Sequence, residues 1–242
     1  MKTITTLIVS LLAGAGLLVG AAHAAGGDVP LQHANIQPDN LKSLQNGAAL
    51  YVNYCYGCHS LEYQRYERMA KDLQLDTDVV IDNLMVTGDK IGDQMKIAMR
   101  KQDAAVWFGT SAPDLTLVAR SRGADWVYSY LKGFYKDPSR PYGVNNTIFP
   151  NVGMPHVLEG LQGLQVKTDD GKLELASQGR MTAEEYDAAV RDLTNFLHYV
   201  GEPMKAERKF IGVFVVLFLL VLFFVAYALK KEYWKDVHGA GH

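Results

Sequence analysis

Cysteine is scarce in this chain: only Cys55 and Cys58 occur among its 242 residues. A zinc site built on further cysteines is therefore excluded, because a closed site needs four ligands and no second cysteine pair exists. The chain also lacks low-complexity tracts, and its 24 Lys/Arg nearly balance its 26 Asp/Glu, for a net charge of −2. We predict no nucleic-acid partner, and the length allows one folded domain with additional segments at its ends.

The N-terminal segment is an apolar run. Residues 4–22 carry no charge, follow Lys2 and end in Ala22-His23-Ala24, whose small residues suit a signal peptidase. We therefore predict a cleavable signal peptide over residues 1–24. The alternative is a second membrane anchor, but the glycines of this run make it a poorer span than one of Leu and Phe.

A second apolar run lies near the C-terminus. Phe210–Leu229 is 20 residues long, carries no charge and has basic residues on both sides. At about 1.5 Å per residue it crosses the ~30 Å hydrocarbon core of a bilayer. We predict a membrane anchor over residues 205–231; the alternative is a buried helix of a soluble protein. The predicted signal peptide then sets the orientation, with residues 25–204 in the periplasm and a short tail, residues 232–242, in the cytoplasm of a bacterial cell.

Both cysteines belong to Cys55-Tyr56-Gly57-Cys58-His59, a spacing typical of covalent haem attachment. In such a segment each thiol adds to a haem vinyl group and the adjacent imidazole reaches the iron. The alternatives are a thioredoxin-like redox pair, which requires a strand-rich fold that the sequence does not indicate, and a zinc half-site, which lacks its remaining ligands. We predict one haem c bound through Cys55 and Cys58, with His59 as an iron ligand.

A second axial ligand has to come from elsewhere in the chain. Met154 lies in Phe149-Pro150-Asn151-Val152-Gly153-Met154-Pro155, and a loop stiffened by two prolines presents a thioether rigidly. His156 is the imidazole alternative, and an open site is another. The remaining downstream candidates are Met69, Met85, Met95, Met99, Met181, Met204 and His198. A thioether ligand raises the reduction potential, so Met154 predicts electron transfer at a fairly positive potential and little oxygen chemistry.

The rest of the chain is predicted to be mainly α-helical with long loops. Hydrophobic periodicity and capping residues predict four helices. They cover residues 39–54, 61–73, 121–134 and 182–200. Residues 164–178 are predicted to form a hairpin that turns at Asp170-Gly171, and we assign this segment no chemistry.

Two arginines, Arg120 and Arg122, follow the stretch Ala112-Pro113-Asp114-Leu115. A guanidinium binds an anionic haem propionate bidentately, so either arginine is a candidate for that contact; the alternative is an exposed arginine at the start of a helix. Residues 25–204 contain 17 Lys/Arg against 23 Asp/Glu, a net charge of −6. This charge would steer a cationic partner, although it serves solubility equally well.

Together these features resemble cytochrome c1, the haem c subunit of the ubiquinol–cytochrome c oxidoreductase (cytochrome bc1 complex), in its proteobacterial form. The motifs that carry the resemblance are Cys55–His59, Pro113-Asp114-Leu115 leading to Arg120 and Arg122, the Met154 loop and the single C-terminal anchor. The resemblance covers most of the mature chain. It implies a class I cytochrome c-like haem domain with long loop insertions, plus one transmembrane helix.

The resemblance also implies roles for individual residues. They are thioethers at Cys55 and Cys58, iron ligation by His59 and Met154, and a propionate contact at Arg122. Pro113 would lie on the histidine side of the haem. Trp126 stands where many relatives have a tyrosine near a propionate, and an indole offers only a donor there.

The implied mechanism is one-electron relay, with no side chain acting as acid, base or nucleophile. A Rieske iron–sulfur protein would reduce the haem, which would reduce a soluble periplasmic cytochrome c. Further implied partners are cytochrome b, the lipid bilayer and a second copy of the complex in a homodimer. Two alternatives remain: a membrane-anchored cytochrome that feeds a terminal oxidase, and a haem peroxidase or gas sensor with a labile sixth site.

Overall fold

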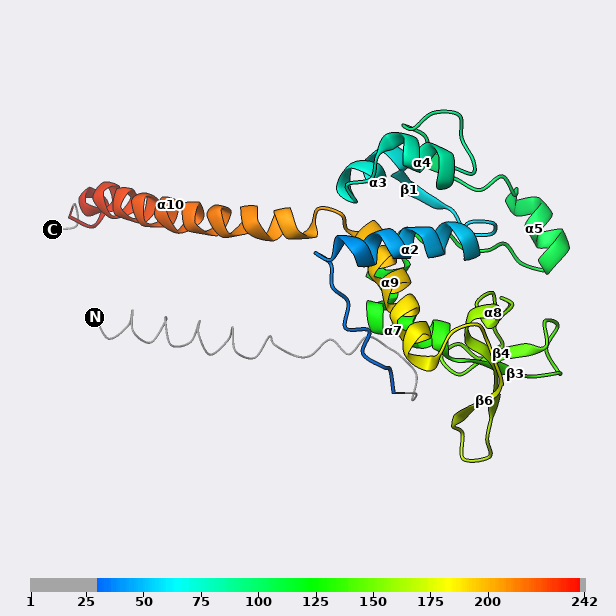
Figure 1. Ribbon diagram of the computed structural model, residues 1–242. Helices are drawn as coiled ribbons and strands as arrows, with labels where there is room; N and C mark the ends of the chain where they lie inside the picture. The colour runs from blue at the N-terminus through cyan, green and yellow to red at the C-terminus, as the bar shows by residue number, and fades with distance from the viewer. Residues whose placement is uncertain (1–29, 240–242) are drawn as a thin grey trace. The chain divides into compact units, whose positions relative to one another are not determined.

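The computed structural model describes residues 30–239, so the predicted signal peptide lies outside the described residues. The described chain is about half helical, with nine helices and three two-stranded antiparallel sheets (Figure 1). This confirms the mainly α-helical prediction. The elements are α2 Leu41–Tyr54, β1 Leu61–Arg65, α3 Tyr66–Asp72, α4 Thr77–Asn83, β2 Gln94–Met95, α5 Lys101–Phe108, α6 Val118–Arg122, α7 Ala124–Lys132, β3 Phe134–Lys136, β4 Val144–Asn146, α8 Glu159–Gln162, β5 Gly163–Lys167, β6 Leu173–Gln178, α9 Ala183–Gly201 and α10 Lys205–Gly239.

The described chain divides into two units. One unit, here called the His59 unit, comprises Asn35–Ala124 together with the chain from Ala183 onward. The other, the Met154 unit, comprises the described residues up to Ala34 together with Asp125–Thr182. Each unit therefore contains one of the two predicted iron ligands.

The core of the His59 unit is the crossing of α2 and α9, which Figure 1 shows lying against each other. Helix α2 begins after Asn40, whose side chain accepts a hydrogen bond from the Ser43 N–H at 3.2 Å. At Gly47 the two backbones come so close that an added Cβ would lie 2.1 Å from the Asp192 carbonyl oxygen. The N-terminal helix of this unit therefore packs directly across its helix α9.

Polar side chains fix the register of this crossing. The Ser43 hydroxyl donates to the Asp192 carboxylate at 2.6 Å. The fully buried Asn195 amide donates to the Ser43 hydroxyl at 3.0 Å and to the Gln37 carbonyl oxygen at 2.7 Å. Because buried polar groups are costly unless they are paired, these bonds favour one alignment of α2 on α9.

The prediction of a helix over residues 61–73 is wrong for its first part. Leu61–Arg65 forms strand β1, which pairs antiparallel with β2, and only Tyr66–Asp72 forms helix α3. The backbone N–H groups of Glu62 and Tyr63 donate to side chains 52 and 53 residues further along the chain. Hydrophobic periodicity is a local signal, so it does not reveal such distant partners.

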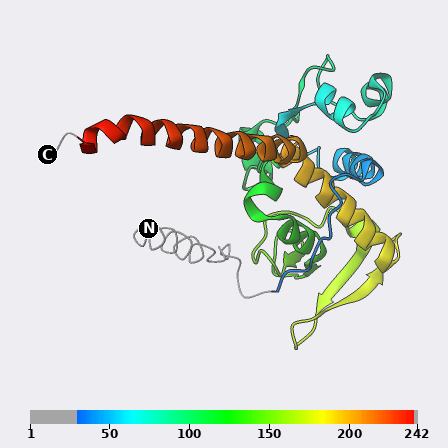
Figure 2. The ribbon, with the colours of Figure 1, turned by 90° about the vertical axis from the view of Figure 1, so that its left-hand side faces the viewer.

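The Met154 unit is built around a small apolar cluster. Phe134, Val144 and Val152 are buried together, and Tyr130 and Met154 pack against them. The predicted hairpin is present as strands β5 and β6, which Figure 2 shows as a two-stranded ribbon. Its turn includes Gly171 at a φ of +83°, a conformation that favours glycine.

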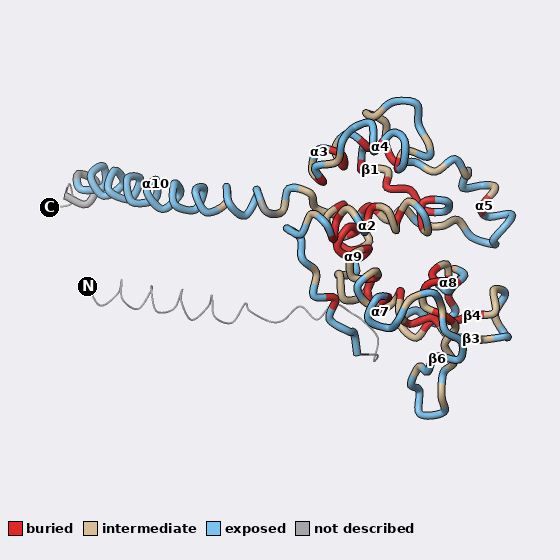
Figure 3. The backbone as a smooth tube through the Cα atoms, in the orientation of Figure 1, coloured by how far each residue is buried: buried red, intermediate tan, exposed pale blue. Residues whose placement is uncertain are grey.

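The C-terminal helix α10 is long and apolar. Figures 1 and 2 show it continuing away from the end of α9, and Figure 3 shows its described surface as exposed. Within the described residues it is the one helix long and apolar enough to cross a membrane, over Glu207–Lys235. It therefore supplies a single candidate membrane anchor, as the sequence predicts.

A short junction, residues 202–204, joins α9 to α10. Its first residue, Glu202, forms an ion pair with Arg120 of α6 at 2.7 Å and another with Arg208 of α10. The Glu202 side chain is only 17% exposed, so the two ion pairs are partly shielded from solvent. One carboxylate thus connects three helices of the His59 unit.

Candidate haem site

The two cysteines lie in a single turn that follows α2. Cys55 is the residue after the helix, and the N–H groups of Cys58 and His59 both donate to its carbonyl oxygen, at 3.1 and 2.9 Å. Both thiols are free; Cys55 is buried and Cys58 is exposed. Burial, with a smaller contribution from Cys58, raises the pKa of the Cys55 thiol to about 12. The predicted attachment residues thus share one turn and form no disulfide.

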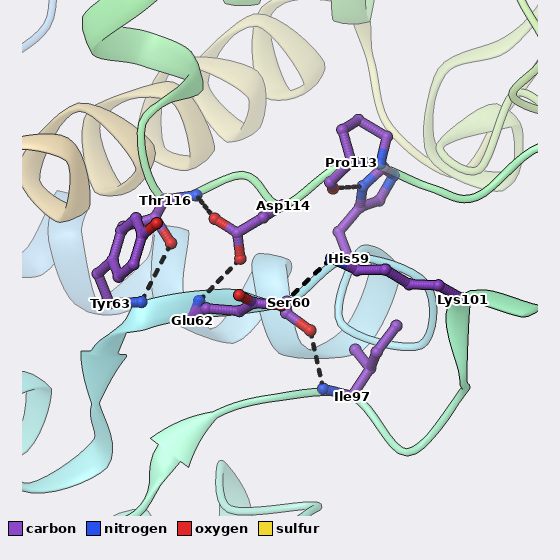
Figure 4. A network of polar contacts seen from close by, with 9 residues as sticks. All are labelled: His59, Ser60, Glu62, Tyr63, Ile97, Lys101, Pro113, Asp114 and Thr116. Carbon is purple, nitrogen blue, oxygen red and sulfur yellow. Dashed lines mark hydrogen bonds and ion pairs between the residues drawn. The ribbon is translucent and has the colours of Figure 1, made fainter.

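His59 is the next residue, and the structure fixes its ring. Its Nδ1 lies 2.7 Å from the Pro113 carbonyl oxygen (Figure 4). A carbonyl oxygen only accepts, so Nδ1 carries the proton and Nε2 is the unprotonated nitrogen of the neutral ring. Burial lowers the pKa of His59, which outweighs the opposing hydrogen bond to Pro113. A buried, neutral imidazole with its second nitrogen free of a proton has the chemistry of a metal ligand.

Tyr56, inside the attachment turn, is a residue that the sequence analysis missed. Its buried hydroxyl lies 2.7 Å from the Tyr66 hydroxyl and 2.6 Å from the Thr87 hydroxyl, and it also reaches the Lys96 carbonyl oxygen at 3.0 Å. These contacts attach the turn to the segments that follow it. The Cys-x-x-Cys-His pattern leaves this position open, so no sequence signal marks it.

The residues of the turn fit a covalently bound porphyrin. A Cβ added to Gly57 would meet no atom within 4 Å, so the chain leaves open space beside the turn. Cys58 also borders a cavity of about 310 Å³, whose wall continues through Ser60, Glu62, residues 96–102, Ala104, residues 111–112 and Asp114. Free thiols, an oriented imidazole and open space beside the glycine are what haem attachment requires.

Met154 lies in a loop that hydrogen bonds hold in place. The Asn151 N–H donates to the Asn145 side chain at 2.8 Å, and the Arg140 guanidinium donates to the Asn151 carbonyl oxygen at 2.9 Å. Asn151 itself has a φ of +62°. The Tyr130 hydroxyl lies 3.4 Å from the Met154 sulfur and donates to it. The thioether is therefore presented by a fixed loop and already has one polar contact.

Aromatic rings line up beside this thioether. Trp126 stacks on Tyr130, with centroids 5.1 Å apart and planes 7° from parallel, and Tyr130 meets Phe134 edge-on at 5.3 Å. His156 stacks on Phe134 at 4.8 Å, and burial lowers the pKa of its ring to about 4. Trp126 is thus brought to Met154 through Tyr130, and His156 is held neutral against an apolar ring.

The two candidate arginines both belong to helix α6. Arg120 is already paired with the Glu202 carboxylate, so its position serves the junction of α6, α9 and α10. Arg122 is the exposed last residue of α6. The propionate contact predicted for Arg122 stays a prediction, while the pairing of Arg120 favours a structural role for that residue.

The sequence also matches a known protein family. A model of the Cytochrome C1 family matches residues 34–237. The chain belongs to the cytochrome c1 family. The resemblance to cytochrome c1 and the fold class inferred from the sequence are therefore confirmed.

Two of the three relatives described next are named cytochrome c1. The chain is 52% identical to cytochrome c1 of Allochromatium vinosum, over 89% of this chain and 93% of that protein. It is 44% identical to a Nitrosomonas europaea protein named ammonia monooxygenase gamma subunit, over 98% of this chain and all of that protein. Mitochondrial cytochrome c1 heme protein of Neurospora crassa is 26% identical, over 80% of this chain and 62% of that protein.

Membership of the family establishes the cofactor and the general role. Cytochrome c1 proteins carry one covalently bound haem c, which agrees with the two free thiols and the oriented imidazole. The chain is a haem-containing electron-transfer subunit of the cytochrome bc1 complex, and this role is consistent with partnership with cytochrome b.

Proposed function

We propose that this chain takes single electrons from a Rieske iron–sulfur protein and passes them to a soluble periplasmic cytochrome c. The observation that carries the proposal is the Pro113 carbonyl oxygen on His59 Nδ1, directly after two free thiols. When bound, the haem supplies the one-electron chemistry; the chain supplies its attachment, orientation and ligands. The transfer requires no proton donor or nucleophile among these side chains.

The proposed binding roles follow the geometry of each unit. Thioethers form at Cys55 and Cys58, and the iron ligands are His59 Nε2 and the Met154 sulfur. Trp126, stacked on Tyr130, offers an indole N–H to a propionate, and Arg122 offers a guanidinium. The hydroxyl that Tyr130 donates to the Met154 sulfur withdraws electron density from the thioether, which favours ferrous iron and raises the potential.

The junction between α9 and α10 supports a fixed relay. A cytochrome that swings toward a terminal oxidase needs a flexible linker, whereas here three residues separate the helices and Glu202 pairs with Arg120 and Arg208 across the gap. We place the His59 and Met154 units in the periplasm, α10 in the inner membrane and the tail in the cytoplasm, within a homodimeric complex. A cleaved signal peptide over residues 1–24 belongs to the same proposal.

The peroxidase or gas-sensor alternative makes a different prediction about the sixth coordination position. Two protein ligands leave no open site, so carbon monoxide should bind poorly to the ferrous protein. Ready binding of carbon monoxide would remove Met154 from the ligand set.

Purification from membranes tests the proposed partners. The full chain, tagged at its C-terminus and solubilised in a mild detergent, should co-purify with a b-type cytochrome and a Rieske protein as a dimeric complex. The purified complex should reduce a soluble cytochrome c from quinol. Recovery with a terminal oxidase alone would contradict the proposal, as would recovery with a monooxygenase, the assembly suggested by the name of the Nitrosomonas relative.

A further inference from the structure

Asp114 follows the proline that orients His59. Its carboxylate accepts two backbone hydrogen bonds, one from the Glu62 N–H at 2.8 Å and one from the Thr116 N–H at 2.9 Å (Figure 4). The second is a local turn within the loop, but the first crosses to strand β1, 52 residues earlier in the chain. One side chain therefore ties the loop at residues 113–116 to the segment that begins with His59.

Two further hydrogen bonds join the same two segments, one on each side of the Asp114 contact. The Leu115 N–H donates to the Ser60 carbonyl oxygen at 3.0 Å, and the Tyr63 N–H donates to the Thr116 hydroxyl at a longer 3.4 Å. The Pro113 carbonyl group lies in the peptide plane that also contains the nitrogen and Cα atoms of Asp114. Holding Asp114 in place therefore restrains the direction of the Pro113 carbonyl.

We propose that Asp114 is a positioning residue that holds the Pro113 carbonyl on the His59 ring and thereby lowers the reduction potential of the haem. The proposal rests on the proposed role of His59 as an iron ligand. A carbonyl that accepts from Nδ1–H makes the imidazole a stronger donor to iron, and a stronger donor favours the ferric form. A carbonyl group that is held less firmly weakens this effect, which stabilises the ferrous form and raises the reduction potential.

The test uses the full chain in its membrane complex with Asp114→Ala and Asp114→Asn. Alanine removes both acceptors, whereas asparagine keeps one oxygen that accepts a single N–H. Redox titration of membranes should show a higher potential in both variants, with the larger rise in D114A. We expect about a threefold shift of the ferric–ferrous equilibrium in D114A, or about 30 mV for a one-electron couple.

Asp76→Ala is the matched control. Asp76 also accepts a backbone N–H two residues further along, from Asp78 at 2.9 Å, but it caps helix α4 of the same unit. Its replacement should leave the potential unchanged. A second readout is solvent exchange of the His59 Nδ1 proton, followed by NMR in the detergent-solubilised chain; exchange should be faster in D114A and unchanged in D76A.

The possible outcomes distinguish a failure of the His59 role from a failure of the Asp114 role. If the unaltered chain shows axial ligation without histidine, the role of His59 fails, and the role of Asp114 fails with it. If histidine ligation is present and D114N has the potential and proton exchange of the unaltered chain, the inference about Asp114 alone is overturned. Should D114A fail to retain haem, the milder D114N variant decides.

Discussion

The two predicted iron ligands are held by different kinds of interaction. His59 is oriented by a main-chain carbonyl group in a loop that hydrogen bonds connect to β1. Met154 instead lies among aromatic rings, and its sulfur accepts a hydrogen bond from the Tyr130 hydroxyl. The first interaction strengthens a nitrogen donor, and the second weakens a sulfur donor. With both residues as iron ligands, as proposed, the two sides would adjust the reduction potential in opposite directions, and each could be altered without the other.

The largest expected effect comes from replacing the ligand on the methionine side. In Met154→Lys the haem should stay attached, because the thioethers belong to the His59 unit. An amine favours ferric iron more than a thioether does, so the potential should fall by on the order of hundreds of millivolts, measured by redox titration. Met181→Lys, in the same unit, is the control. An unchanged potential in M154K would show that another group is the ligand.

A smaller effect is expected from disrupting the fold of the histidine side. Gly47→Ala places a Cβ 2.1 Å from the Asp192 carbonyl oxygen and 2.6 Å from the Phe196 Cβ, so α2 and α9 have to move apart. We expect a loss of about 2–3 kcal/mol in the free energy of unfolding, seen as a lower thermal midpoint. Gly160→Ala is the control, because its added Cβ meets nothing within 4 Å. Equal midpoints for the two variants would contradict the close crossing.

The smallest effect is expected from removing the hydrogen bond that the Tyr130 hydroxyl donates to the Met154 sulfur. Tyr130→Phe keeps the ring that stacks on Trp126 but removes the hydrogen bond to the Met154 sulfur. Since a net hydrogen bond is worth about 1 kcal/mol and only part of it differs between oxidation states, the potential should fall by about 30 mV.

Tyr128→Phe is the matched control for this change, because the Tyr128 hydroxyl contacts Lys132 at 3.3 Å. A rise in the potential of Y130F, or an equal shift in both variants, would refute the opposite signs of the two sides.

Local signals account for what the sequence predicted correctly. The cap at Asn40, the periodicity of α9 and the Asp170-Gly171 turn are each specified by a few neighbouring residues, and the structure contains all three elements. The attachment turn is likewise contained in five consecutive residues, Cys55–His59.

Distant partners account for what the sequence did not reveal. Strand β1 depends on pairing with β2, about 30 residues later in the chain, and on acceptors beyond position 113 for two of its N–H groups. Gly47 is needed because another helix crosses there. The partner of Arg120 is Glu202, 82 residues further along the chain, and no local pattern indicates it. Tyr130 carried no recognisable motif, since a tyrosine in a helix is ordinarily a packing residue.

Continuity of the C-terminal helix has an angular consequence. Helix α10 is unbroken from Lys205 to Gly239, and the Glu202 ion pairs join its start to α6 and α9. Each residue of an α-helix turns the chain by about 100°, so the face of α10 that packs in the membrane also determines the direction in which the His59 ring points around the helix axis. One residue inserted after Arg208 would rotate that direction by more than a quarter turn, without changing any of the proposed ligands.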